Sequence, residues 1–326
     1  MRKLKFSAAI NEAQHMAMIN NSDIIQIGQG INSPFYVGQT MVGLLDRFGV
    51  ERLIDTPLSE SAITGMAIGA AITGLRPILT FPRMDFMYYS MDQICNHIST
   101  FNYSLGGNSP IPLLIRAIIN RKGEQGAQHS QALHGLFMHI PGLTIIMPSN
   151  SFDAKGMFLA ALEEENPVIF IEDSELYQEE CVVPEEYYIV DLKKAKVTNE
   201  GDDITMVSSS VLLSKSKDAL IELKKMGINV ELIDLRIIKP IDFETILNSV
   251  KKTKKIIVVD GGWSTAGVAS EIISMVAIKG IRLSNPPIKI TLPDLPEPAS
   301  SVLEEAYYPN TAKIITETLK NFNRNL

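Results

Sequence analysis

Potentially reactive side chains come directly after predicted buried strands of this chain. Glu60 follows a strand at 52–54, in the segment DTPLSESAITG, and Arg83 and Asp85 follow a strand at 77–81. His129 lies in a long loop with three glycines after a strand at 112–117. Ligands of open parallel sheets bind beyond the carboxyl ends of the strands. We therefore expect a binding site built from these loops.

The residue types leave alternatives open for Glu60 and His129. Glu60 can be a first-turn carboxylate that stabilises the Gly- and Ala-rich helix after it. Alternatively, an apolar pocket raises its pKa and lets it pass a proton to a ligand nitrogen. His129 is either a surface-loop histidine or a functional one.

The other aromatic and histidine candidates favour structural interpretations. Phe86, Tyr88 and Tyr89 are spaced as core residues more often than as a cofactor platform. His134 and His139 are expected to be structural or partly exposed. His15 and His97 have no partner at metal-ligand spacing and receive no role.

The elements that position these residues indicate an α/β fold. Short, nearly continuous apolar runs at 23–27, 52–54, 77–81, 112–117, 143–147 and 167–171 alternate with helical patterns. Such strands are buried on both faces, as in a parallel sheet between helix layers. Ser149 or Ser151 is the expected cap of the helix that follows the fifth run, with Asp153 in its first turn.

A polar, acidic stretch at 175–203 separates this pattern from a second, smaller α/β unit. We therefore predict a first domain at 1–180, a linker at 181–202 and a second domain with its own sheet at 203–326. A length of 326 residues suits two domains.

Composition narrows the class of protein. A formal charge of −7 and a pI near 5.4 argue against nucleic acid as a partner. Two cysteines without metal-ligand spacing suit a reducing compartment. Polar residues interrupt the N-terminal stretch, and no apolar window approaches the ~20 residues of a membrane span. The expected protein is soluble and cytoplasmic.

Several longer motifs resemble one family. These are RLIDTPLSESAITGMAIGAAITGLRPILTF, GAQHSQ followed by HIPGL, PSNSFDAKGMFLAAL with ENPVIFIE, and IDLRIIKPID. They resemble the beta subunit of the thiamine-diphosphate-dependent 2-oxo acid dehydrogenase decarboxylase component, of the pyruvate, branched-chain and acetoin type. The resemblance runs from about residue 6 to residue 308. It implies a transketolase-like pyrimidine-binding domain followed by a transketolase C-terminal-like domain.

The resemblance also implies roles for single residues. Glu60 matches the glutamate that hydrogen-bonds the cofactor's aminopyrimidine, so that this ring can take the proton from the nearby thiazolium carbon. Phe86 matches the aromatic residue that stacks on the pyrimidine, and Tyr89 lies in the same cofactor-binding segment. His129 matches the histidine implied in proton transfer around the decarboxylated adduct and in acyl transfer to lipoyl. Leu113, Ala161, Glu164 and Asn166 resemble a structural potassium site.

The chain lacks the GDG motif with downstream asparagines by which thiamine enzymes hold magnesium and the diphosphate. In the resembled family an alpha subunit supplies these groups, which implies an alpha2-beta2 heterotetramer. The second domain is expected to serve beta–beta assembly and docking of a lipoyl acyltransferase.

Several residues depart from the family pattern, including Gln29, Arg83, Asp85, Tyr89 and the pair Ala117-Ile118. Arg83 and Asp85 border the expected pocket, which suggests a 2-oxo acid substrate that is larger or carries a further anionic group. Two other functions stay open: a carboligase or transketolase-like subunit that transfers a two-carbon unit to an aldehyde or sugar, and a catalytically silent scaffold for an alpha subunit.

Overall fold

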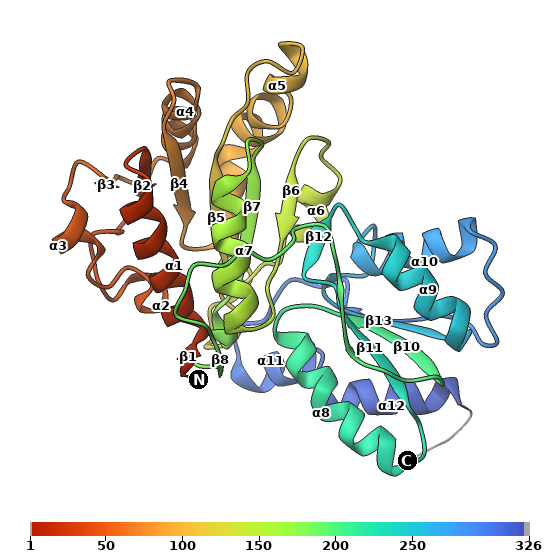
Figure 1. Cartoon of the computed structure of the whole chain (residues 1–326). Coiled ribbons are helices and arrows are strands. Elements are labelled where there is room, and N and C mark those ends of the chain that lie inside the picture. Colours follow the sequence, from red (N-terminus) through yellow and green to blue (C-terminus); the bar gives the residue numbers. More distant parts are fainter. Residues whose placement is uncertain (1, 323–326) are drawn as a thin grey trace.

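The computed structural model describes residues 2–322 and contains two main sheets, each between layers of helices (Figure 1). The larger sheet has seven strands, and all neighbours run parallel except the first pair. In spatial order the strands are β12 (Ile237–Lys239), β6 (Thr144–Ile146), β7 (Val168–Asp173), β5 (Leu114–Ile119), β4 (Arg76–Phe81), β2 (Ile24–Gly28) and β3 (Leu53–Asp55).

Strand residues alternate between two hydrophobic cores, because successive side chains of a strand point to opposite faces. Ile78, Leu114 and Phe170 pack toward α1 (Phe6–Asn20) and α7 (Ser151–Glu163). Leu79 and Ile115 pack on the opposite face, with α4 (Glu60–Ile72). Burial on both faces explains why these strands are apolar throughout, as the sequence predicted.

Short helices connect the strands of this sheet at its edges. They are α2 (Tyr36–Gln39), α3 (Leu44–Phe48), the 3-10 helix η1 (Met84–Ser90), the π-helix η2 (Gln93–Ile98), α5 (Phe101–Ser104), α6 (His134–Met138) and the 3-10 helix η3 (Ser174–Leu176). Of these, η1 and α6 carry residues that the sequence analysis selected.

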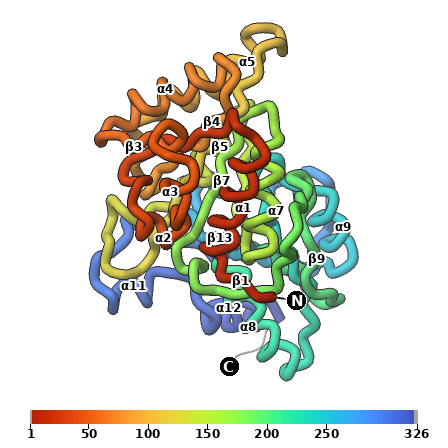
Figure 2. Tube along the Cα trace, turned by 60° about the vertical axis from the view of Figure 1, so that its left-hand side comes forward, coloured from red at the N-terminus to blue at the C-terminus, as the bar shows by residue number. Residues whose placement is uncertain are grey.

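The second sheet has the order β14 (Ile288–Leu292), β13 (Ile256–Trp263), β10 (Ile204–Ser208), β11 (Val230–Asp234) and β9 (Lys196–Asn199). Only β9 runs antiparallel to its neighbour. Helices α8 (Val211–Lys225) and α12 (Thr311–Asn321) cover one face, while α9 (Phe243–Thr253) and α10 (Val268–Ile278) cover the other (Figure 1). A further helix, α11 (Ser301–Tyr307), lies near the first sheet (Figure 2).

The two halves of the chain are joined by more than covalent linkage. Strand β12 comes from the second half and pairs with β6 of the first sheet. The polar stretch at 175–203, where no pattern predicted an element, contributes β9 to the second sheet and β8 (Glu180–Val182) to a small sheet with β1 (Lys3–Lys5). These short edge strands are stabilised by backbone pairing, which leaves no hydrophobic pattern in the sequence.

The cap of α7 differs from the prediction. The side chain of Asn150, not of Ser149 or Ser151, accepts a hydrogen bond from the backbone N–H of Asp153. Ser149 instead donates its hydroxyl hydrogen to Asp234 at the end of β11. The serine therefore joins the two halves of the chain.

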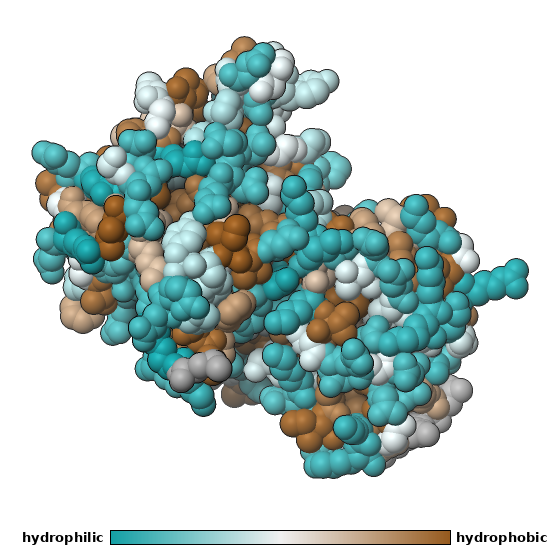
Figure 3. All heavy atoms as spheres, in the orientation of Figure 1, coloured by the Kyte–Doolittle hydropathy of each residue, from teal (hydrophilic) through white to brown (hydrophobic). Residues whose placement is uncertain are grey.

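Hydrophilic residues predominate on the face shown in Figure 3, and hydrophobic ones form scattered patches. Over residues 2–322, no helix combines the length and the apolar character needed to cross a bilayer.

Candidate active site

Strands β3, β4 and β5 bring the predicted catalytic residues to one edge of the larger sheet, in which β2 lies between β3 and β4. Glu60 begins α4 shortly after β3, Phe86 lies in η1 directly after β4, and His129 lies in the loop after β5. Parallel strands end at the same edge, so these loops meet there. This is the location that the strand pattern predicted.

The carboxyl of Glu60 is half-buried at the first position of α4. No side chain among the described residues bonds it, and the positive end of the helix dipole favours its charge. The Thr64 hydroxyl lies 2.7 Å from the Glu60 carbonyl oxygen and 2.8 Å from the Ser90 hydroxyl. Because Ser90 ends η1, this contact fixes the start of α4 against the helix that carries Phe86.

Phe86 and His129 are in direct contact. Their ring centroids are 5.4 Å apart and their planes form an angle of 84°. Both side chains are half-buried. An edge-to-face pair leaves one face of a ring free for another planar group.

Arg83 and Asp85 flank this pair and contact the loop that carries His129 (residues 120–131, here the histidine loop). Arg83 donates to the side-chain oxygen of Gln125 at 3.3 Å. Asp85 is buried and accepts from the backbone N–H of Gln131 at 3.2 Å, whereas its second oxygen accepts no hydrogen bond. Burial raises the pKa of Asp85, and the hydrogen bond from Gln131 opposes that rise.

Tyr36 is a site residue that the sequence analysis missed. Burial raises the pKa of its phenol, the charge of Arg83 lowers it, and the charges of Asp55 and Glu60 raise it. Its hydroxyl has no hydrogen-bond partner within the described chain. Only the tertiary structure brings α2 here, so no local signal could have identified it. Tyr89, in contrast, is 69% exposed.

The second half of the chain holds the histidine loop in place. Arg121 is buried, forms an ion pair with Asp173 at 3.2 Å, and donates to the carbonyl of Gly261 at 3.1 Å. Gly261 leaves no room for a side chain beside this guanidinium. Glu124 accepts from the backbone N–H of Ser301, while its own backbone N–H donates to Glu304 of α11. The loop lies beside α11 in Figure 2.

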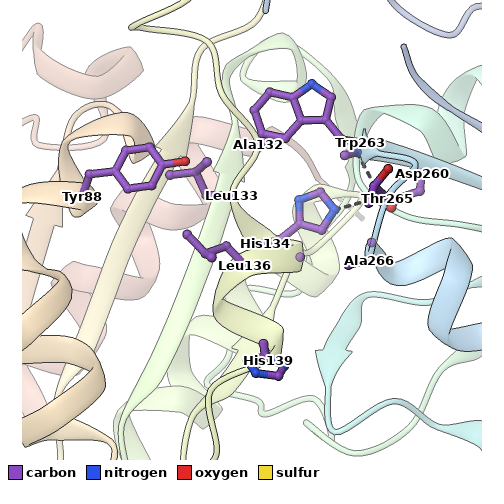
Figure 4. Close-up of a pocket in the computed structure, with 13 residues that line it drawn as sticks. Tyr88, Ala132, Leu133, His134, Leu136, His139, Asp260, Trp263, Thr265 and Ala266 are labelled. Carbon is purple, nitrogen blue, oxygen red and sulfur yellow. Dashed lines mark hydrogen bonds and ion pairs between the residues drawn. The ribbon is translucent and has the colours of Figure 1, made fainter. Parts of the chain in front are cut away.

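A pocket of about 510 Å³ opens between the two halves next to this loop (Figure 4). Its residues include Tyr88, Leu136, Trp263 and the buried pair of His134 and Asp260. His134 Nε2 lies 2.8 Å from Asp260 Oδ1. Burial alone would raise the pKa of Asp260, but the charge and hydrogen bond of His134 lower it below its ordinary value. His134 is buried and His139 is exposed; the sequence analysis expected these two histidines to be structural or partly exposed.

The residues of the predicted potassium site surround the end of α7. Glu164 accepts on its carbonyl from Arg76 at 3.0 Å, and Leu113 accepts on its carbonyl from Val168 at 3.0 Å. The side-chain oxygen of Asn166 accepts from Asn102 at 3.0 Å. Ala161 lies in the last turn of α7.

The site suits one half of a thiamine cofactor. A pyrimidine needs a carboxylate for its ring nitrogen and an apolar or aromatic wall, and Glu60 and Phe86 provide groups of these types. Within residues 2–322, no cluster of three or more His, Cys, Asp or Glu side chains is arranged to hold a metal ion.

Two protein families match the chain, one in each half. The transketolase pyrimidine-binding domain family matches residues 2–180, and the transketolase C-terminal domain family matches residues 193–314.

Curated relatives match over nearly the whole length. Acetoin:2,6-dichlorophenolindophenol oxidoreductase subunit beta of Bacillus subtilis (strain 168) is 38% identical, over 98% of this chain and 97% of the relative. Pyruvate dehydrogenase E1 component subunit beta of Rickettsia felis is 35% identical, over 96% of both chains. A solved structure described as split gene transketolase, inactive beta4 tetramer, superposes with a TM-score of 0.82. That match covers 99% of this chain and 100% of the other at 18% identity, and it shows a common fold.

Proposed function

Because this chain belongs to the family of transketolase-like beta subunits of thiamine-diphosphate-dependent 2-oxo acid dehydrogenases, we propose that Glu60 activates the cofactor for decarboxylation of a 2-oxo acid. The acyl group then passes to a lipoyl carrier. One observation carries this assignment: the half-buried Glu60 begins a helix fixed against η1, whose Phe86 contacts His129.

Each residue of the site has a distinct task in this proposal. When bound, thiamine diphosphate would supply an acidic thiazolium carbon whose conjugate base is the nucleophile for the substrate carbonyl. Glu60 holds a proton at the pyrimidine nitrogen, and the half-buried position strengthens that hydrogen bond. Phe86 stacks on the pyrimidine, with Tyr89 beside it. His129 moves a proton at the reacting centre, next to the ring of Phe86.

Arg83 and Asp85 are proposed to recognise the substrate. Both lie directly after β4 and both contact the histidine loop, so they flank His129. The guanidinium of Arg83 can pair with a substrate carboxylate. Arg83→Ala is therefore expected to raise the Michaelis constant for the true substrate.

We propose an alpha subunit as the partner that holds Mg²⁺ and the diphosphate. The two relatives reported above are beta subunits by name. The outer face of α4 supports a helical contact: Met66 and Ile72 are exposed, and Gly65 and Gly69 have open space where a side chain would be. Small residues let another backbone approach closely, next to Glu60. Assembly as an alpha2-beta2 heterotetramer through the second domain, and docking of a lipoyl acyltransferase, belong to the same proposal.

Two further proposals concern the organisation of the chain. Its domains are 1–180 and 203–326, with a linker at 181–202, close to the two matched families. Carbonyl and side-chain oxygens of Leu113, Ala161, Glu164 and Asn166 are proposed to bind a structural potassium ion at the end of α7.

The test is to co-express the chain with an alpha subunit encoded beside it, add thiamine diphosphate and Mg²⁺, and screen 2-oxo acids. Release of carbon dioxide with an artificial electron acceptor is expected. Glu60→Gln should lower kcat by at least about 100-fold, because a positioned proton-transfer group typically contributes that much. The same variant should slow proton exchange at the thiazolium carbon, measured by NMR without any substrate.

A matched control is Glu51→Gln, which removes an exposed carboxylate shortly before β3 and should keep full activity. Full activity of Glu60→Gln would instead assign the chain to a scaffold. Transfer of a two-carbon unit to an aldehyde or sugar, without lipoyl acylation, would favour the carboligase function.

A further inference from the structure

A buried carboxyl outside the predicted site faces the histidine loop from the second half of the chain. Glu297 is only 3% exposed, and neither of its oxygens accepts a hydrogen bond from another described residue. It lines an open pocket of about 450 Å³ together with Ala127 and Gln131 of the histidine loop. A buried carboxyl without a partner costs free energy, so such a group is retained where a ligand completes its hydrogen bonds.

We infer that this Glu297 pocket, whose Gln131 is hydrogen-bonded to Asp85, is the subsite that binds the hydroxylated end of the substrate. The inference rests on the proposed function and adds the substrate class to it. The expected substrate is a 2-oxo acid that carries hydroxyl groups on its chain, in place of a plain alkyl 2-oxo acid.

Asp85 connects the pocket to the candidate active site. It precedes Phe86 in η1, and one of its oxygens accepts from the backbone N–H of Gln131, which lines the pocket. Its other oxygen is free of hydrogen bonds within the described chain. Burial and the charge of Asp85 together raise the pKa of Glu297 to about 7, and the charge of Arg121 opposes the rise. Asp85 is therefore linked to the pocket wall through Gln131.

The protonation of Glu297 favours hydroxyl groups as ligands. A carboxyl with a pKa near 7 exists in both forms at neutral pH, and it accepts a hydrogen bond in one form and donates one in the other. A hydroxyl group can do both, whereas an ammonium group can only donate.

The remaining walls are rigid and partly aromatic. Trp263 and Tyr307 both donate hydrogen bonds to the carbonyl of Leu295, at 3.2 Å and 2.7 Å. These bonds fix the segment that carries Glu297, and Trp263 lines the pocket. A few oriented polar groups on an apolar, aromatic wall are typical of small-molecule sites of this volume.

Matched substrates test the subsite in the complex reconstituted with its alpha subunit, Mg²⁺ and thiamine diphosphate. The pairs are pyruvate with 3-hydroxypyruvate, and 2-oxobutanoate with 4-hydroxy-2-oxobutanoate. At least one hydroxylated member should have a kcat/KM at least about tenfold above its partner, since hydrogen bonds to ionisable groups discriminate at this level. Glu297→Leu should remove this preference, and Glu297→Gln should keep part of it. Asp218 is an exposed acid on α8, and Asp218→Asn should leave the preference for the hydroxylated substrate unchanged.

A second readout does not depend on catalysis. Trp263 is the single tryptophan of the chain and lines the pocket, so its fluorescence in the chain alone should respond saturably to 3-hydroxypyruvate but not to pyruvate. Glu297→Leu should abolish the response. Equal kcat/KM values within both pairs, or a preference that survives Glu297→Leu, overturn the inference and leave the proposed function standing. Saturable, Glu297-dependent fluorescence in a complex that decarboxylates no 2-oxo acid keeps the subsite and removes the proposed function. A Glu297→Leu variant that fails to assemble with the alpha subunit, and whose tryptophan fluorescence in the chain alone still responds to 3-hydroxypyruvate, assigns Glu297 to the subunit contact and overturns the inference.

Discussion

The ring of Phe86 meets the imidazole of His129 edge to face, with 5.4 Å between the ring centroids. The two residues are far apart in sequence, but β4 and β5 are neighbours in the sheet and deliver them to the same edge. In the proposed site, this pair forms an aromatic wall for the cofactor.

The contact predicts a cofactor-binding effect for Phe86. Phe86→Leu keeps apolar volume but loses the aromatic face, so the Kd for thiamine diphosphate should rise about two- to tenfold. Titration of the reconstituted complex measures it. Tyr103→Leu is the matched control, because Tyr103 is 90% exposed and lies outside the site. An unchanged Kd for Phe86→Leu argues against stacking on this ring.

The buried pair of His134 and Asp260 predicts a stability effect between the two halves of the chain. His134→Leu leaves the Asp260 carboxylate buried without its partner, and the free energy of unfolding at pH 7 should fall by about 3 kcal/mol. The double variant with Asp260→Asn should recover part of this loss, since it removes the uncompensated charge. Urea unfolding measures both. Equal stability of the single and double variants contradicts the prediction.

The same pair gives a pH dependence. The pKa of Asp260 is held below its ordinary value in the folded chain, so its stabilising contribution is present above the unfolded-state pKa of about 3.9. The contribution is lost as pH falls through the folded pKa. His134→Leu should therefore reduce the slope of stability against pH in this acidic range, and a slope identical to that of the parent chain would argue against the pairing.

Arg116 and Glu172 form a second buried ion pair, between β5 and β7. Both side chains are fully buried, with Nε to Oε1 at 2.6 Å and Nη2 to Oε2 at 3.0 Å. Glu172→Gln retains the shape but leaves the guanidinium charge uncompensated, so it should cost about 3–5 kcal/mol of unfolding free energy. Glu163→Gln, on the same half of the chain but with an exposed hydrogen bond to Tyr187, should cost less than about 1 kcal/mol. Chemical unfolding of both variants measures these two losses of unfolding free energy.

The sequence predicted where the strands of the first sheet lie along the chain, because buried parallel strands leave uninterrupted apolar runs. It thereby also predicted the loops that carry Glu60, Phe86 and His129. It did not single out Tyr36, or Glu297 in the pocket beside the histidine loop. Both residues come from segments that are distant in sequence from the loops selected above. Neither the tyrosine nor the glutamate, which lies between two prolines, belongs to a local pattern that indicates burial. The pairing of β12 with β6 was equally invisible, since three residues of edge strand carry no periodicity.

Asp234 predicts a loss of stability as pH rises. It is fully buried at the end of β11, with Ser149 donating to one oxygen and no hydrogen bond to the other within the described chain. Burial raises its pKa to about 7, and the charge of Asp153 adds to the rise. Between about pH 4 and pH 7 the folded chain keeps a proton that the unfolded chain has released, so the free energy of unfolding falls with rising pH and then levels off.

Asp234→Asn cannot ionise, and it should flatten this decline. The free energy of unfolding of the variant should exceed that of the parent chain by at least about 1 kcal/mol at pH 8. At pH 5 the two values should lie closer together. Some decline should persist, because burial also raises the pKa of Glu297 to about 7 and of Asp173 to about 6. Asp218→Asn, an exposed acid on α8, should follow the parent curve. Urea unfolding from pH 5 to pH 8 tests this, and a parent curve that rises over that range would show that Asp234 is ionised in the folded chain.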